Sequence, residues 1–146
     1  MEQKLLSKLQ AQCSRREYCS RDIYDKALKA LEGDAAGAQE ILGSLIKDGF
    51  VDDLRYASAF ARDKASLQGW GPIKITHMLR AKGIPSDTIR QALAEIDAPK
   101  AEEKLRRLIE AKRKTLEGDP AARLKLIRFA LSRGYDYDAI RPLLDD

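Results

Sequence analysis

The chain repeats itself with a period of about fifty residues, and this repetition limits the folds that it can adopt. When the sequence is shifted by 51 positions, KGIPSDTIRQAL (82–93) aligns with RGYDYDAIRPLL (133–144), with the same residue at five of twelve positions. A looser first copy with a longer loop lies around residues 33–45. Units of this size bury little apolar surface alone and depend on their neighbours. The sequence therefore predicts a repeat array instead of a single globular core.

Helix-ending and helix-starting residues are clearest in the middle of the chain. One helix is predicted to close at Gly49, because glycine readily adopts the left-handed conformation of a helix C-terminus. The next is predicted to open at Asp52-Asp53, whose carboxylates can cap free N–H groups and interact with the helix dipole. A third is predicted to run from Pro72, which suits a first helical turn, to Gly83. The paired aspartates are therefore interpreted as caps, in preference to a metal site.

Apolar residues recur at helical spacing through the rest of the chain, and no stretch has the convincing pattern of a strand. The fold class is therefore predicted to be all-α, with nine helices. In the first half of the chain, helices are also predicted over about Glu2 to Glu17, from an N-cap at Ser20 to Gly33, and through Ala38 to a close at Gly49. In the second half, helices are predicted over Ile89 to Ile96, from Pro99, from Asp119-Pro120 to Gly134, and from Asp136 or Tyr137. Leu67 and Met78 are expected on the core faces of their helices.

The helices group into three tandem three-helix repeats, over residues 1–50, 51–97 and 98–146. Charged residues make up 34% of the chain and aromatic residues only 6%, which favours a large surface for the enclosed volume. We therefore expect an elongated, curved helical array of the right-handed type.

Composition and motifs exclude several classes of protein. No apolar run approaches a membrane span and the polar N-terminus has no secretory signal, so a cytoplasmic protein is expected. Cys13 and Cys19 are not spaced as CxxC, and His77 is the single histidine, so neither a redox pair nor a metal site is predicted. Without a Ser/His/Asp set or a glycine-rich phosphate loop, we predict no catalytic residues, no cofactor and no enzymatic activity.

The formal net charge is +4, from 27 Lys and Arg residues against 23 Asp and Glu residues. Such an excess fits either a well-solvated helical surface or an anionic partner, such as nucleic acid or an acidic protein face. The candidate partner-binding residues are Arg15, Arg16, Arg21, Lys74, Arg80, Lys82, Lys104 and Arg107. Along the helix from Pro99 the alternative is a set of i,i+4 ion pairs such as Glu102–Arg106.

Two further residues leave alternatives open. Trp70, which lies between two glycines, can stack on a base or anchor a protein interface, or it can fold back over the neighbouring helix ends. Arg55 can pair with Asp52 or Asp53, or it can face a partner.

Three segments resemble one family. GFVDDLRYASAFARDK (49–64) resembles the G-[YF]-[IVL]-[DN]-D-x-R-[FY]-A stretch of the RecX regulatory proteins, and GPIKITHMLRAKGI (71–84) resembles their G-x-x-[KR]-I-x-x-x-L-x-x-K-G-[IV] stretch. SRREYCSRDIYDKALK (14–29) is similar to the R-x-x-S-x-x-[ED]-L-x-x-K-L segment of their first repeat. Two features depart from the family: Met78 stands where members often carry a polar or acidic residue, and KALEGDAAG (29–37) replaces a K-G-[VI] close.

The resemblance implies a non-enzymatic modulator of the bacterial RecA recombinase. RecX proteins bind RecA–single-stranded-DNA filaments in the helical groove and usually restrain filament growth and strand exchange, and some also bind DNA. The leading hypothesis is therefore that this chain binds the filament as a monomer and inhibits RecA in DNA repair, recombination and the SOS response, with Trp70 and the basic residues above as contacts. The alternatives are a helical module that binds nucleic acid without RecA, and an adaptor for an unrelated protein.

Overall fold

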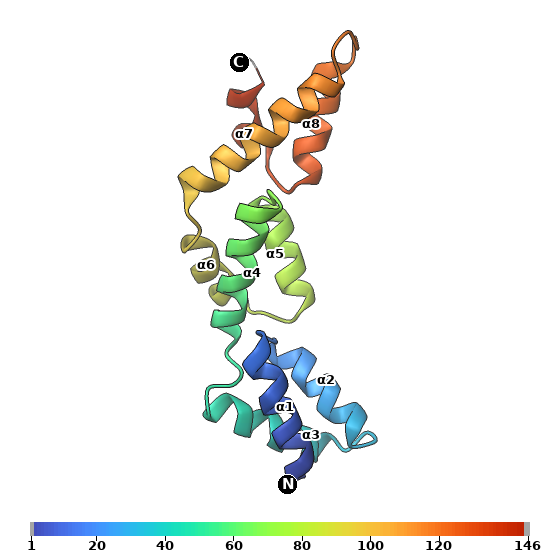
Figure 1. Cartoon of the computed structure of the whole chain (residues 1–146), viewed down its shortest axis with the longest axis vertical. Coiled ribbons are helices and arrows are strands. Elements are labelled where there is room, and N and C mark those ends of the chain that lie inside the picture. Colours follow the sequence, from blue (N-terminus) through green and yellow to red (C-terminus); the bar gives the residue numbers. More distant parts are fainter. Residues whose placement is uncertain (1, 145–146) are drawn as a thin grey trace. The chain divides into compact units, whose positions relative to one another are not determined.

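The computed structural model describes residues 2–144, and every regular element among them is a helix (Figure 1). The α-helices are α1 (Gln3–Arg15), α2 (Ser20–Ala30), α3 (Ala35–Lys47), α4 (Asp53–Leu67), α5 (Pro72–Ala81), α6 (Ser86–Ala94), α7 (Ala98–Thr115), α8 (Ala122–Ser132) and α9 (Tyr137–Ile140), followed by a 3-10 turn over Arg141–Leu143. The predicted all-α fold is confirmed. Within the described residues, no helix has the length and apolar composition needed to cross a bilayer.

The chain forms two compact units. The first comprises Met1–Ala59 and Leu79–Ala92, and the second comprises Phe60–Met78 and Leu93–Asp146. Helices α4, α5 and α6 each have residues in both units.

The core of the first unit lies among α1, α2 and α3. Leu9, Ile23, Ile41 and Leu45 are its most deeply buried large side chains. Within each helix the buried residues recur at three- or four-residue spacing, which places them on one face: Leu6 and Leu9 in α1, Ile23 and Ala27 in α2, Ile41 and Leu45 in α3. The turn into α3 is fixed by Asp34, whose carboxylate accepts the Gly37 N–H at 3.0 Å.

The core of the second unit contains Leu105 and Ile109 of α7, Leu126 and Ala130 of α8, and Ile140 of α9. Its last element follows the repeat only in part, since α9 has four residues where α6 has nine. Pro142 lies 51 positions after Gln91 and has no N–H to donate to a helical carbonyl, so the chain tightens into the 3-10 turn.

Two junctions between helix ends repeat with the 51-residue period. In the second unit, the N–H groups of Gly71 and Ile73 donate to the carbonyl oxygens of Arg133 and Gly134, at 2.7 and 3.0 Å. N–H groups at the start of α5, which have no partner within that helix, thereby bond to carbonyl oxygens at the end of α8. The positive end of one helix dipole meets the negative end of the other.

In the first unit, the equivalent junction joins the start of α2 to the end of α5 through side chains. Arg21 donates to the Ala81 carbonyl oxygen at 2.8 Å, and Lys82 pairs with Asp22 at 2.9 Å. The hydrogen bond to Asp22 raises the pKa of Lys82, which keeps this cation charged. The start of one helix is therefore joined to the end of another by main-chain hydrogen bonds in the second unit and by charged side chains in the first.

Two predicted helix starts are wrong. Ser20 is the first residue of α2 rather than its N-cap, and its hydroxyl and N–H donate to the Asp53 carboxylate at 2.6 and 2.7 Å. Helix α8 begins at Ala122 instead of Pro120, because Asp119 caps a preceding turn by accepting the Ala121 N–H at 2.8 Å. In both places a contact outside the helix takes the carboxylate or hydroxyl that local sequence assigns to capping.

Two predicted core positions are also wrong. Leu67 is 68% exposed, because the buried face of α4 follows Ala57, Ala61 and Ala65, and a residue two positions further points away from it. Met78 is 39% exposed. The inward face of α5 is centred on Ile75 and Leu79 and extends toward the half-buried Thr76 instead.

Asp119 supplies a prediction for pH. Its carboxylate lies 2.5 Å from the Lys125 ammonium, and this contact together with the Ala121 N–H lowers its pKa. A lowered pKa stabilises the fold fully above the unfolded-state pKa of about 4, and this stabilisation is lost as the pH falls through the folded-state pKa. We expect Asp119→Asn to be less stable than the parent at pH 7, with a difference that shrinks under acid. Urea denaturation at a series of pH values measures it, and a difference that does not change with pH would contradict the prediction.

Candidate functional site

The loop between α4 and α5 carries Trp70, the most distinctive candidate contact. The chain turns back here because the Trp70 N–H donates to the Lys64 carbonyl oxygen at 2.9 Å, after Gly69 adopts a φ of +69°. The half-buried indole meets the Phe60 ring edge-on, with centroids 6.1 Å apart. Trp70 therefore folds back over the neighbouring helix ends, which was one of the two predicted alternatives.

Two lysine side chains lie over the Trp70 indole. The Nζ atoms of Lys64 and Lys74 are 4.8 and 4.3 Å from the ring centroid, within the range of cation–π attraction. Lys104 lies close to the same loop, since a Cβ added at Gly69 would be 3.5 Å from its Cγ. We call Lys64, Lys74 and Lys104 the loop lysines.

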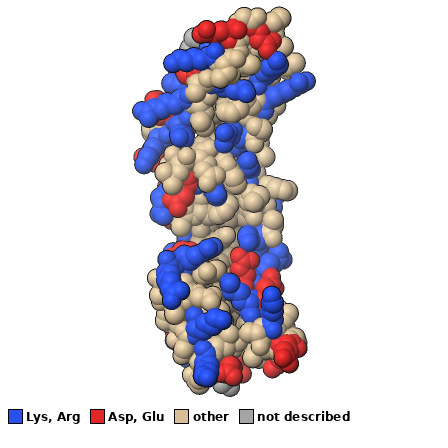
Figure 2. Space-filling view, turned by 45° about the vertical axis from the view of Figure 1, so that its right-hand side comes forward, with Lys and Arg blue, Asp and Glu red and all other residues tan. Residues whose placement is uncertain are grey.

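The loop lysines have no acidic partner. In the part of the chain that the structure describes, none of them has a carboxylate oxygen within 4.0 Å. The ammonium groups of Lys64 and Lys74 are therefore stabilised by aromatic rings and solvent, and that of Lys104 by solvent. Figure 2 shows basic side chains dispersed over the visible face with acidic ones among them. The loop lysines are therefore distinguished by lacking a carboxylate partner, and not by forming a separate basic patch.

The basic residues of α7 are arranged differently. Arg107 pairs with Glu103 at 3.0 Å, and Arg106 pairs with Glu102 at 3.3 Å. These i,i+4 ion pairs correspond to the alternative of a solvated helix surface, which the sequence offered in place of partner contacts. No sequence pattern indicated the role of Arg113, which donates to the carbonyl oxygens of Leu143 and Leu144 at 2.9 and 3.2 Å.

The candidates of the first unit divide into two groups. Arg21 and Lys82 lie together at the α2–α5 junction, where both are engaged in contacts within the chain. Arg15, Arg16 and Arg80 are exposed, and Arg16 lies 4.6 Å from the centroid of the Tyr18 ring. The sequence grouped all five as partner contacts, whereas only those of the second group have no hydrogen bond or ion pair within the described residues.

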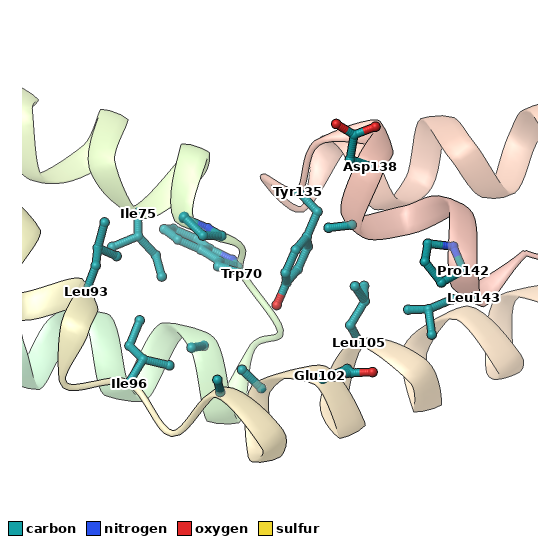
Figure 3. A pocket seen from close by; sticks show the side chains of 15 residues that line it. Trp70, Ile75, Leu93, Ile96, Glu102, Leu105, Tyr135, Asp138, Pro142 and Leu143 are labelled. Carbon is teal, nitrogen blue, oxygen red and sulfur yellow. The ribbon is translucent and has the colours of Figure 1, made fainter.

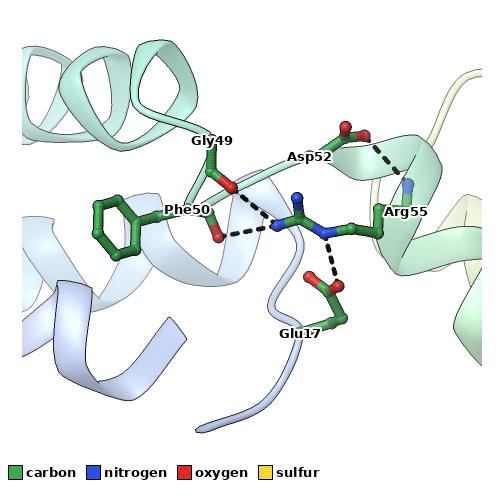
Figure 4. Close-up of polar contacts among 5 residues, drawn as sticks. All are labelled: Glu17, Gly49, Phe50, Asp52 and Arg55. Carbon is green, nitrogen blue, oxygen red and sulfur yellow. Dashed lines mark hydrogen bonds and ion pairs between the residues drawn. The ribbon is translucent and has the colours of Figure 1, made fainter. Parts of the chain in front are cut away.

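Arg55 joins three segments of the first unit (Figure 4). Its Nε lies 2.6 Å from Glu17, and its guanidinium also donates to the carbonyl oxygens of Gly49 and Phe50, at 3.0 and 3.3 Å. The hydrogen bond to Glu17 raises the pKa of Arg55. Of the two alternatives for Arg55, the ion pair with Asp52 or Asp53 is therefore wrong.

The Asp52-Asp53 pair serves two different helices. Asp52 accepts the Arg55 N–H at 3.0 Å and so caps α4, as predicted. Asp53 faces Ser20 at the start of α2. Among residues 2–144 there is no group of three or more His, Cys, Asp or Glu side chains able to hold a metal ion.

Both cysteines are free, and Cys19 is fully buried. Burial raises the pKa of both thiols, so neither is activated as a nucleophile. We expect an aromatic disulfide reagent to modify Cys13 at least tenfold faster than Cys19 in the native protein, and both at similar rates in denaturant. Mass spectrometry of the labelled peptides measures these rates, and equal native rates would contradict the burial of Cys19.

Comparisons with known proteins connect these features to one family. Residues 52–93 match the family model for the second three-helix domain of RecX, and residues 101–144 match the model for its third three-helix domain. A regulatory protein RecX of Chromohalobacter salexigens is 33% identical over 132 residues, which cover 88% of this chain and 82% of the relative. A regulatory protein RecX of Clostridium botulinum is 37% identical over 101 residues. The match covers 66% of this chain but only 47% of that relative, so the chain spans about half of its length.

Solved structures have the same fold. The crystal structure of a regulatory protein RecX superposes with a TM-score of 0.86 at 23% identity, over 98% of this chain and 71% of that one. The structure of RecX from Lactobacillus salivarius superposes with a TM-score of 0.81 at 24% identity, over 97% and 95% of the two chains.

Proposed function

This chain belongs to the family of RecX regulatory proteins, and from that membership we propose that it binds the RecA–single-stranded-DNA filament and restrains RecA recombinase and ATPase activity. It acts as a regulatory protein and not as an enzyme. Its partners are RecA protomers and the DNA that they hold, and its role is in DNA repair and recombination.

The lack of acidic partners for the loop lysines supports an anionic partner most directly. Each exposed or half-buried ammonium group that lacks a carboxylate raises the local positive potential. A filament that contains single-stranded DNA presents phosphates, and neutralising them releases counterions. Arg15, Arg16 and Arg80 of the first unit contribute in the same way. Arg21, Lys82 and Arg107 are already engaged within the chain, so we assign them smaller contributions.

The direct test is RecA-dependent ATP hydrolysis on single-stranded DNA with the purified chain added. We expect hydrolysis to fall at stoichiometric amounts of the chain. No change in hydrolysis, together with no binding to the filament, would remove this proposal.

Matched triple variants test the role of the loop lysines. Lys64→Ala/Lys74→Ala/Lys104→Ala is expected to weaken filament binding by about tenfold or more and to reduce its salt dependence. Lys8→Ala/Lys29→Ala/Lys47→Ala removes the same charge from exposed positions of the first unit and is expected to have a smaller effect. Equal losses in the two variants would show that net charge, and not the loop lysines, governs binding.

A second candidate function is nucleic-acid binding without RecA. The placement of two ammonium groups over one indole favours it, because bases stack on aromatic rings while lysines neutralise phosphates. Titration of labelled single- and double-stranded DNA at several salt concentrations distinguishes the candidates. Tight, steeply salt-dependent binding in the absence of RecA would favour the second.

A further inference from the structure

A cavity of about 460 Å³ opens in the second unit, beside Trp70 (Figure 3). We call it the Trp70 cavity. Residues of α4, α5, α6, α7 and α9 line it, and most of its walls are apolar. The larger wall side chains include Trp70, Ile75, Leu93, Ile96, Leu105 and Leu143. Its volume is in the range of about 300–1,000 Å³ that is usual for ligand-binding cavities.

One polar group inside the cavity lacks a partner. Tyr135 is only 9% exposed, and its hydroxyl oxygen points into the space between Trp70 and Leu105 (Figure 3). No hydrogen bond to this hydroxyl occurs among residues 2–144. The buried side-chain atoms that lack a partner do not include this hydroxyl, so it is open to the cavity and offers one donor and one acceptor to an occupant.

Carboxylates lie at the edge of the same cavity. Glu102 of α7 and Asp138 of α9 both line it, and both are exposed. Glu102 is paired with Arg106, whereas Asp138 has no ion-pair partner in the described residues. The two carboxylates favour a cation beside them, whereas Lys64 and Lys74 lie over the Trp70 indole in another part of the wall.

We propose that the Trp70 cavity receives an apolar side chain of the protein component of the filament, one that is followed or preceded by a lysine or arginine. The apolar side chain fills the cavity, a main-chain carbonyl oxygen of the same segment accepts the Tyr135 hydroxyl, and the adjacent cation pairs with Asp138. This inference rests on the proposed function, and it names the part of the partner that this surface recognises.

A nucleobase fits the cavity less well than an apolar side chain. The edge of a base carries several donors and acceptors, and the cavity has a single inward-pointing polar group to meet them. Polar atoms that enter an apolar site without partners lose the hydrogen bonds that water gave them.

Cavity-filling variants test the inference in the full chain. Ala101 and Ala139 line the cavity, so Ala101→Leu and Ala139→Leu are each expected to weaken filament binding at least tenfold. Ala111→Leu is the matched control, because Ala111 is an exposed alanine of the same helix α7 that does not line the cavity. It is expected to bind within twofold of the parent. Tyr135→Phe is expected to weaken binding about threefold and to leave the unfolding midpoint unchanged.

The single tryptophan of the chain gives a second readout. With 5-fluorotryptophan incorporated, the fluorine resonance reports on Trp70 alone. We expect it to shift when RecA filaments are added and to stay unchanged with single-stranded DNA alone. A shift with DNA alone would make a base the occupant, and a shift that grows with the concentration of the chain itself would make it a second copy. Either result overturns the inference.

The binding data separate this inference from the proposed function. If the parent binds filaments and folded Ala101→Leu and Ala139→Leu bind them as tightly as Ala111→Leu, the cavity inference fails and the proposed function stands. If the parent does not bind filaments at all, both fail.

Discussion

Replacing Gly134 with alanine is expected to lower the free energy of unfolding by about 2–5 kcal/mol, as the sum of left-handed backbone strain and overpacking. Gly134 has a φ of +97°, which L-residues rarely adopt. A Cβ at this position would lie 2.6 Å from the Lys74 backbone nitrogen and would also clash with the Lys74 Cβ. The α5–α8 junction must separate to accommodate it, so its main-chain hydrogen bonds are lost as well.

Gly118 is the matched control for Gly134→Ala. Its φ is +81°, but nothing lies within 4 Å of an added Cβ. Gly118→Ala is therefore expected to cost only the backbone strain, about 1–2 kcal/mol. Urea denaturation followed by circular dichroism measures both variants. Equal shifts of the two urea midpoints would show that the clash of the added Cβ with Lys74 costs no stability.

Replacing Arg55 with alanine is expected to lower the free energy of unfolding by about 1–2 kcal/mol, below the range for a fully buried charged hydrogen bond because the side chain is 45% exposed. Three acceptors lose a donor together: the Glu17 carboxylate and the carbonyl oxygens of Gly49 and Phe50. A carboxylate oxygen of Glu17 is already buried without a hydrogen bond, so this side chain tolerates the loss poorly.

Arg62→Ala is the matched control for Arg55→Ala, because both residues lie on α4. Arg62 pairs with Asp63 at 3.5 Å, and the two side chains are 66% and 58% exposed. Exposed pairs of this kind contribute about 0–1 kcal/mol, so a small shift of the urea midpoint is expected. A double-mutant cycle with Glu17→Gln isolates the Arg55–Glu17 interaction. A coupling energy near zero would contradict the role assigned to Arg55.

The sequence predicted the helices well where one local signal was sufficient. Gly83 and Gly134 end helices α5 and α8 with positive φ, and Asp136 caps α9 by accepting the Ala139 N–H. The apolar spacing also identified buried residues such as Ile89 and Ile140. These features depend on residues a few positions apart, so that the sequence pattern carries most of the information about them.

Predictions failed where a distant residue competes with a local one. Ser20 was expected to cap its own helix, but Asp53, which is 33 positions away, accepts both of its donors. One of the two alternatives for Arg55 was an ion pair with Asp52 or Asp53, but it pairs with Glu17 instead. The Trp70 cavity was missed for the same reason, because its walls come from five helices and the unpaired Tyr135 hydroxyl has no signature in the sequence.

The two junctions that share one place in the repeat differ in how solvent can influence them. Arg21 and the half-buried Lys82–Asp22 pair act through charges that are partly open to solvent, so dissolved ions screen them. The bonds from Gly71 and Ile73 to the end of α8 are neutral amide contacts, which screening barely affects. Rising ionic strength should therefore loosen one joint of the chain and leave the other intact. The salt concentration of the medium therefore changes the stability of one junction independently of the other.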